Sequence, residues 1–225
     1  MNKILLQIRG NMCLQLFATF SITSGMLAST FWWYNLAYLI QQPSYICTFE
    51  DDEMSDDQCT AANICDGAFG IIGFEIDFSN SNSILNWHQK LDLMCAESWK
   101  VNFLGAAYLI GSAVTVLWIP RLSDKSGRKW FYGAGVMIDF ALFSAIFLVD
   151  NLDIMIGIMF CFGATNVLRT QIGLVYMMEF NPKNLQIVIG SLWGISRAFI
   201  KSFSTIYFWK ISKNWLYIIG VGYGF

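Results

Sequence analysis

The sequence predicts an all-α membrane protein with several helical spans, because of its composition, the length of its apolar segments and one short basic loop. Apolar residues make up 56% of the 225 residues, and charged residues make up only 13%. Soluble domains carry about 25% charged residues, so too few charges are present to cover a water-soluble globule of this size. A lipid environment accounts for this shortfall if the apolar residues come in spanning lengths.

Apolar segments long enough to cross a bilayer recur along the chain. A bilayer core of about 30 Å requires about 20 helical residues, because a helix rises about 1.5 Å per residue. Five segments meet this requirement, at about 12–40, 101–119, 130–149, 154–178 and 187–209. A sixth, 215–225, would cover only about half of the core, so we expect either a truncated sequence or a last helix that does not span alone.

The segment between the first two spans, about 41–99, is the one long polar segment of the sequence and contains an acidic run at 50–57. It is longer than ordinary connections, so we expect a small folded cap or a partly disordered loop. Its cysteines lack the close Cys-x-x-Cys pairs of zinc modules. We therefore expect two disulfides with three possible pairings, free thiols or a zinc site being the alternatives, among Cys47, Cys59, Cys65 and Cys95.

The distribution of Lys and Arg predicts the orientation in the membrane. Four of the nine residues in the short loop 121–129, between the second and third spans, are basic. Cytoplasmic loops carry an excess of basic residues, so we expect this loop and the N-terminus in the cytoplasm and loop 41–99 outside the cell or in a lumen. The protein is then an integral, multi-pass membrane protein, and we favour the plasma membrane over an internal one.

The basic loop also resembles a family signature. Residues 120–129, Pro-Arg-Leu-Ser-Asp-Lys-Ser-Gly-Arg-Lys, are similar to the Gly-x-x-x-Asp-x-x-Gly-Arg-Lys/Arg loop between spans two and three of the major facilitator superfamily. Gly127 would permit a tight turn, and Asp124 and Arg128 could form charge-assisted hydrogen bonds. Anchoring by positive charge alone explains neither Asp124 nor Gly127. The resemblance implies a conformational latch made by Asp124, Gly127, Arg128, Lys129 and Glu179.

Two other segments are similar to the organic cation and anion transporters of that superfamily. Residues 93–101, Leu-Met-Cys-Ala-Glu-Ser-Trp-Lys-Val, lead from the cysteine-bearing loop into the second span, as a Cys followed by Trp-Lys does in that family. Tyr176-Met-Met-Glu179 resembles the Tyr-x-x-Glu that closes span four there and in related sugar transporters. The resemblance implies that 1–225 is the N-terminal six-helix bundle of a major facilitator fold, with the sixth helix truncated.

Three features depart from the family pattern. Pro120 stands at the leading Gly of the loop signature, and Gln186 stands where an Arg is common seven residues after Glu179. In the family, the translocation path lies between two six-helix halves. Residues 1–225 do not contain the second half. The resemblance therefore implies that a C-terminal half or a second chain completes the path.

Charged residues within the predicted spans are candidates for a substrate cavity, because such groups are costly in lipid and face a cavity or one another. Arg197 and Lys201 share one helix face and would attract a carboxylate or sulfonate better than an organic cation. Asp139 and Arg169 could instead pair, and Lys201 could extend toward the outer surface. Substrate binding and a structural role therefore both stay open for the candidate cavity residues, which are Asp139, Asn166, Arg169, Arg197 and Lys201.

The first span carries many hydroxyl residues and ends in aromatic ones. Hydroxyl side chains such as Ser29 commonly join helices, although a place in the cavity lining is the alternative. Trp32, Trp33 and Tyr34 are expected as anchors at the membrane interface.

The expected function is transmembrane transport of a small organic ion or other polar metabolite by alternating access, with the lipid bilayer and a small-molecule substrate as partners. No catalytic residues, cofactor or metal are expected, because the sole histidine, His88, lies in the loop and no phosphate-binding loop is present. A net charge of −2 gives no reason to expect nucleic acid. The alternative is a truncated remnant that does not transport, or a structural membrane subunit.

Overall fold

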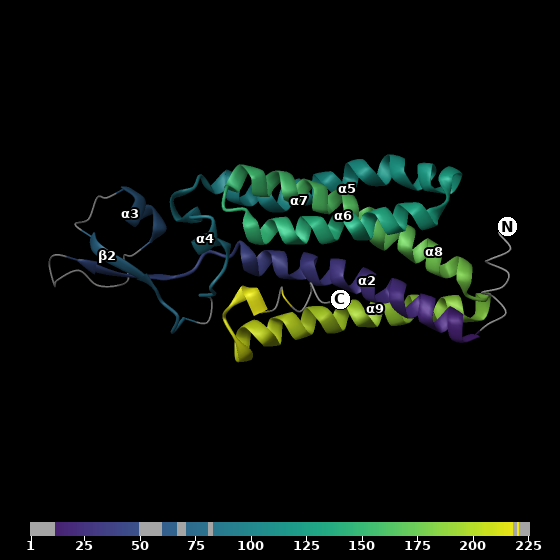
Figure 1. The fold of residues 1–225 in the computed structure, drawn as a ribbon. Helices are drawn as coiled ribbons and strands as arrows, with labels where there is room; N and C mark the ends of the chain where they lie inside the picture. Colours follow the sequence, from purple (N-terminus) through teal and green to yellow (C-terminus); the bar gives the residue numbers. More distant parts are fainter. Residues whose placement is uncertain (1–11, 50–59, 67–70, 81–82, 218–219, 221–225) are drawn as a thin grey trace.

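The computed structural model describes residues 12–49, 60–66, 71–80, 83–217 and 220. Within them, long helices lie along one common direction and form an elongated bundle (Figure 1). A small cap of short helices and two strands projects from one end of the bundle, which we call the cap end. The opposite end, where α5 joins α6, is called the turn end.

The bundle contains the helices that the apolar segments predicted. They are α2 (Met12–Leu39), α5 (Ser98–Ser126), α6 (Arg128–Leu148), α7 (Leu152–Asn166), η3 (Val167–Gln171), α8 (Ile172–Phe180), α9 (Lys183–Ile206) and η4 (Tyr207–Ile211). The π-helix η3 joins α7 and α8 into one segment, and the π-helix η4 extends α9. Each of the five full-length predicted spans therefore coincides with one continuous helical segment.

Three helices among the described residues are long and apolar enough to cross a membrane. They are Ser98–Ser126, Arg128–Leu148 and Leu152–Glu179. The fold is thus mainly helical and embedded in a membrane. Most of the predicted sixth span, 215–225, lies outside the described residues, so a six-helix bundle is not shown.

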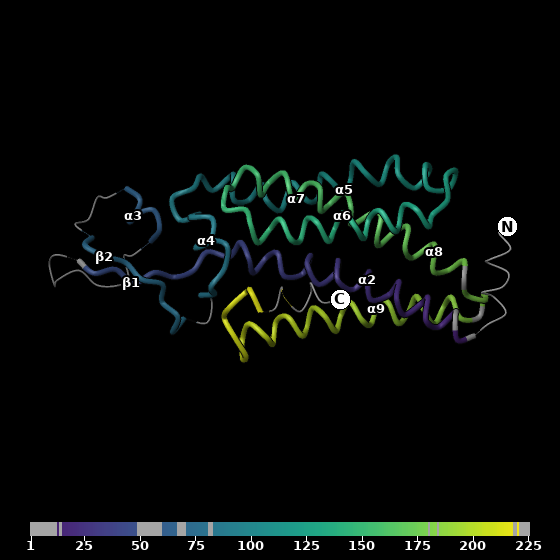
Figure 2. The backbone as a smooth tube through the Cα atoms, viewed as in Figure 1, coloured from purple at the N-terminus to yellow at the C-terminus, as the bar shows by residue number. Residues whose placement is uncertain are grey.

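Two layers of helices make up the bundle, with α2 and α9 side by side in one and α5, α6 and α7 in the other (Figure 2). The closest packing lies between α5 and α7, where each helix has a glycine at the contact. A Cβ on Gly111 would lie 2.0 Å from the Phe160 carbonyl oxygen, and a Cβ on Gly163 would lie 1.9 Å from that of Tyr108. These two backbones can therefore touch only because both residues lack a side chain.

Aromatic side chains fill the core between the layers. Trp32 of α2 is 1% exposed and stacks on Phe162, with 5.1 Å between the ring centroids. It also meets Phe143 edge to face at 5.3 Å and Trp87 of the cap at 5.7 Å. The expectation that Trp32 anchors the membrane interface is therefore wrong, because its ring belongs to the packed core and links the bundle to the cap.

Loop 41–99 is a folded cap in the parts that the structure describes. It contains β1 (Tyr45–Phe49), α3 (Ala61–Asp66), β2 (Ile71–Ile76), α4 (Trp87–Lys90) and the 3₁₀ helix η2 (Leu93–Cys95). The strands pair antiparallel, with Cys47 opposite Phe74. This hairpin is a departure from the all-α expectation. The acidic run 50–57 lies outside the described residues.

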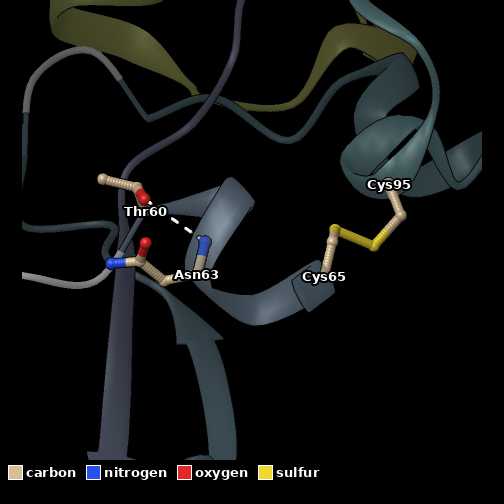
Figure 3. Close-up of a disulfide and its surroundings, with 4 residues drawn as sticks. All are labelled: Thr60, Asn63, Cys65 and Cys95. Atoms are coloured by element: carbon tan, nitrogen blue, oxygen red, sulfur yellow. Dashed lines mark hydrogen bonds between the residues drawn. A yellow bond between two sulfur atoms is a disulfide. The ribbon is translucent and has the colours of Figure 1, made fainter. Parts of the chain in front are cut away.

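The cap is tied to several bundle elements. Within the cap, Cys65 of α3 is bonded to Cys95 of η2, which directly precedes α5 (Figure 3). Lys213, after η4, donates to the Phe78 and Asn80 carbonyl oxygens at 2.5 and 2.6 Å. Lys90 of α4 donates to a carbonyl oxygen in the last turn of α6. The cap thus connects the cap ends of helices from both layers.

Candidate functional site

The turn between α5 and α6 depends on a glycine conformation. Gly127 has φ +99°, in the region that side chains rarely adopt, while a Cβ there would meet no atom within 4 Å. Glycine is therefore required by the backbone angle and not by crowding. Its N–H donates to the Ser123 carbonyl oxygen at 2.9 Å and ends α5, and Arg128 then begins α6.

Arg128 joins three helices at the turn end. Its Nε and Nη2 donate to Asp124 Oδ1 of α5 at 3.0 and 2.7 Å, and its Nη1 donates to Glu179 Oε1 of α8. The structure thus brings together three of the residues that the family resemblance placed in a latch. Lys129, which the resemblance also placed there, is exposed and forms no ion pair with a described residue. Whether this network acts as a latch stays a prediction.

Both sequence departures near this network have a structural account. Helix α5 continues through Pro120 to Ser126, so the helix does not end at the position of the missing glycine. Gln186 donates to the Met178 and Asn181 carbonyl oxygens at 2.8 and 3.1 Å. It therefore supports the end of α8 beside Glu179 with a neutral amide, where a charged side chain is common in the family.

Asp139 and Arg169 form a buried ion pair in the bundle. The side chains of Arg169 and Asp139 are only 6% and 1% exposed, and Arg169 Nη1 donates to Asp139 Oδ2. Arg169 Nη2 donates to the Gly25 carbonyl oxygen, and Thr165 donates to Asp139 Oδ1. Of the two readings left open for these residues, the structure shows the pairing.

A polar hollow of about 320 Å³ lies between the two layers, and we call it the Arg197 hollow. Residues of α2, α5, α7, η3, α8 and α9 line it. Its polar lining includes Ser29, Ser112, Asn166, Thr170, Gln171 and Arg197. Neither Asp139 nor Arg169 lines this hollow, although Ser29 also donates to Asp139 Oδ2 at 3.4 Å.

Arg197 is the charged group of this hollow. Its guanidinium carbon lies 5.7 Å from the ring centroid of Trp193, and the side chain forms no ion pair with a described residue. The Asn166 and Gln171 amides also have no hydrogen-bond partner among the described residues. Within the described part of the chain, the hollow therefore presents one cation without an ion pair and two side-chain amides without hydrogen-bond partners, a set that can bind an anionic oxygen and orient the rest of a small molecule.

Lys201 lies four residues beyond Arg197 on α9 but lines a different hollow. That hollow has a volume of about 400 Å³, and we call it the Lys201 hollow. Lys201 Nζ lies 5.9 Å from the ring centroid of Tyr34, and the side chain forms no ion pair with a described residue. The five predicted cavity residues are thus divided among the Arg197 hollow, the Lys201 hollow and the buried ion pair.

Sequence reasoning missed several residues at these places. Trp33 and Tyr34 were expected at the membrane interface, yet Trp33 lines both hollows and Tyr34 lines the Lys201 hollow. Thr165 and the Gly25 carbonyl oxygen complete the buried ion pair, and no pattern in the sequence singles them out. Ser29 belongs to the hydroxyl-rich first span, which was the available signal for its contact with Asp139.

The cap holds the disulfide-bonded cysteines and the sole histidine. Besides the Cys65–Cys95 bond, Cys47 is disulfide-bonded, whereas Cys59 lies outside the described residues. His88 Nε2 lies 3.2 Å from the Ile40 carbonyl oxygen, and its buried Nδ1 has no hydrogen-bond partner among the residues that the structure describes. Burial lowers the pKa of His88. Among the described residues, no group of His, Cys, Asp and Glu side chains could hold a metal ion.

Comparison with known proteins adds no family assignment. No protein-family model matches the chain, and no curated protein sequence is significantly similar to it. The case for a function therefore depends on the two hollows, the ion pairs and the membrane helices.

Proposed function

We propose that this chain is part of a membrane transporter of the major facilitator type, and that it moves a small organic anion by alternating access through the Arg197 hollow. The observation that carries the proposal is the Arg197 guanidinium, which forms no ion pair with a described residue and lies in a polar hollow lined in part by α5, α7 and α8, whose segments are apolar enough to cross a membrane. Transporters place their substrate sites between helices near the middle of the membrane, and the two bundles rock around that site.

The state of Arg197 favours an anion over a cation. A charged side chain within a membrane span costs several kcal/mol unless it is paired or hydrated, roughly 2.5–3.5 on insertion scales. Arg169 meets this requirement through Asp139, whereas Arg197 has no counter-charge among the described residues. A bound carboxylate or sulfonate would supply that counter-charge and would accept two parallel hydrogen bonds from the guanidinium.

The remaining lining supports a ligand with an organic body. The Trp33 and Trp193 rings offer flat apolar surfaces, and the Asn166 and Gln171 amides offer both donors and acceptors. A volume of about 320 Å³ accommodates a small metabolite and is at the low end of the range for ligand pockets, roughly 300–1,000 Å³.

The Arg128 network supports the proposed mechanism at the turn end. It joins α5, α6 and α8 through one guanidinium whose side chain is 23% exposed, so water can compete for each contact. Such a network can form in one state and open in another at low cost. In the proposal it holds the turn end closed in one state of the cycle.

Uptake into vesicles tests this proposal. The purified chain is reconstituted into phosphatidylcholine vesicles and supplied with labelled 2-naphthoate or with the shape-matched cation 2-naphthylmethylammonium. We expect saturable uptake of the anion and not of the cation, and about tenfold less anion uptake for Arg197→Gln, because a charge-assisted contact is lost. Lys125→Gln, which removes an exposed charge far from the hollow, is the matched control.

The other outcomes separate the alternatives. Saturable binding without uptake by a folded protein would mean that a second half or a second chain is needed for movement. If the folded protein shows no binding and no uptake, the alternative is favoured, namely a structural membrane subunit or a remnant that does not transport. Anion uptake that Arg197→Gln leaves unchanged would place the substrate site elsewhere.

A further inference from the structure

The Lys201 hollow follows the Arg197 hollow along the same helices. On α2, Thr30 lines the Arg197 hollow, and Tyr38, two turns closer to the cap, lines the Lys201 hollow. On α9, Arg197 and Lys201 are separated by one turn, a rise of about 6 Å. Both helices run toward the cap end (Figure 1), so both place the Lys201 hollow on the cap side.

Helix α5 gives the same order independently, because it runs in the opposite direction. Ser112 lines the Arg197 hollow, and Gly105, which comes earlier in the sequence and closer to the cap, lines the Lys201 hollow. Three helices of mixed direction therefore agree that the hollows are consecutive.

A stacked aromatic pair lies where the two hollows meet. Trp33 of α2 lines both, and its ring lies 4.6 Å from that of Tyr108 of α5, with 20° between the ring planes. Tyr108 lines only the Arg197 hollow of the two and is 4% exposed. Trp33 is the more exposed ring of the pair and is the residue that the linings of the two hollows share.

The chemistry of the Lys201 hollow differs from that of its neighbour. Its lining is mostly apolar and aromatic, with Leu36, Ala37 and Ile40 among its members. The Tyr38 and Thr205 hydroxyls are 3.1 Å apart and hydrogen-bond to each other, so they offer less to a ligand. Lys201 is the charged group. One cation beside apolar walls suits an anion with an apolar body.

We propose that the Lys201 hollow is a second anion site, where an amphiphilic organic anion binds on the cap side of Trp33 before it reaches Arg197. This inference rests on the proposed function, since it adds a second site to the same path. Lys201 holds the carboxylate or sulfonate, and the wall of Trp33, Tyr34 and Leu36 holds the apolar body. Displacement of the Trp33 ring would then connect the two sites.

Binding stoichiometry tests the second site directly. The chain is placed in phosphatidylcholine nanodiscs and titrated with labelled 2-naphthoate. We expect two equivalents per wild-type chain and one equivalent for Gly105→Leu, whose side chain would occupy the Lys201 hollow. A Cβ at Gly105 meets no atom within 4 Å, so this substitution has room. Gly157→Leu is the matched control, because Gly157 also has open space and lines neither hollow, and it should bind two equivalents.

Charge variants assign the two equivalents. Lys201→Gln should weaken one of them about tenfold and leave the other unchanged, and Arg197→Gln should do the reverse. The wild-type chain could bind one equivalent that only Arg197→Gln removes. That result would overturn the second site, and the proposed function would stand. This result would also follow if a phospholipid filled the Lys201 hollow. No binding by a folded wild-type chain would overturn both proposals.

Discussion

Asp139 of α6 and Arg169 of η3 form an ion pair in the bundle core, where the two side chains are 1% and 6% exposed. Asp139→Asn leaves the guanidinium without a counter-charge, so the free energy of unfolding should fall by about 3–5 kcal/mol. Thermal unfolding in detergent measures the change. Asp153→Asn, at an exposed position in the first turn of α7, should cost less than about 1 kcal/mol.

A double substitution separates the value of the charge pair from the cost of breaking it. Asp139→Leu with Arg169→Met removes both charges together. It should unfold at a higher temperature than Asp139→Asn, because no buried charge is left alone. A double variant less stable than Asp139→Asn would show that the pair itself stabilises the bundle.

The contact between Gly111 and Gly163 predicts a sharp difference between glycine positions. Gly111→Ala places a Cβ 2.0 Å from the Phe160 carbonyl oxygen, so α5 and α7 must separate, at a cost of about 1–3 kcal/mol. Gly157→Ala on α7 meets no atom within 4 Å, and it should be neutral or stabilising by up to about 1 kcal/mol. Equal unfolding temperatures for the two variants would be inconsistent with the close approach of these helices.

The Arg128 network should affect function more than stability. Glu179→Gln removes one of its two ionic contacts, and a partly exposed ion pair contributes less than about 1 kcal/mol. We therefore expect a small change in unfolding temperature, faster hydrogen exchange in the first turn of α6, and altered anion uptake. Lys125→Gln is the control, and the latch hypothesis fails if Glu179→Gln matches that control in both exchange and uptake.

His88 predicts a pH-dependent cap. Burial lowers the pKa of His88 from its ordinary value of 6.5, although the Ile40 carbonyl oxygen partly opposes this effect. The unfolded cap therefore binds a proton more readily than the folded one, and cap stability should fall as the pH drops below about 6.5. Glu75 and Asp92 are the acidic residues that line a hollow together with His88.

Hydrogen exchange of the peptide 84–95 measures this pH effect. Protection should decrease between pH 7.5 and pH 5.5 in the wild-type chain. His88→Gln retains an N–H that can donate to Ile40 but does not titrate, so most of the decrease should disappear. The same decrease in both proteins would assign it to other groups.

Much of the bundle could be predicted because spanning length and apolar composition are local properties of the sequence. The first span, expected at 12–40, is α2 at Met12–Leu39, and the basic turn at Gly127 joins two helices as expected. The β1–β2 hairpin could not be predicted, since its pairing joins residues 22 to 31 positions apart across a polar loop. Nor does local composition reveal the π-helix at Val167–Gln171, which carries Arg169.

The candidate site was predictable in its residue types but not in its contacts. The sequence identified Arg169 and Arg197 as charges within spans, yet one is paired and the other lines a hollow. This difference depends on how the helices are rotated and on the close contact of α5 with α7, and side-chain packing decides both. Trp32 was misplaced for the same reason, because its ring turns into the core and not toward the interface.

All of these proposals require that α5 crosses a membrane, and site-directed labelling tests this claim most directly. In a chain with Cys13→Ser and Cys161→Ser, which replaces the free cysteines among the described residues, a reporter is introduced as Ser79→Cys in the cap or as Ser126→Cys at the turn end. A membrane-impermeant maleimide on intact cells should label Ser79→Cys at once and Ser126→Cys only after the membrane is opened. Labelling of both reporters on intact cells would contradict the account.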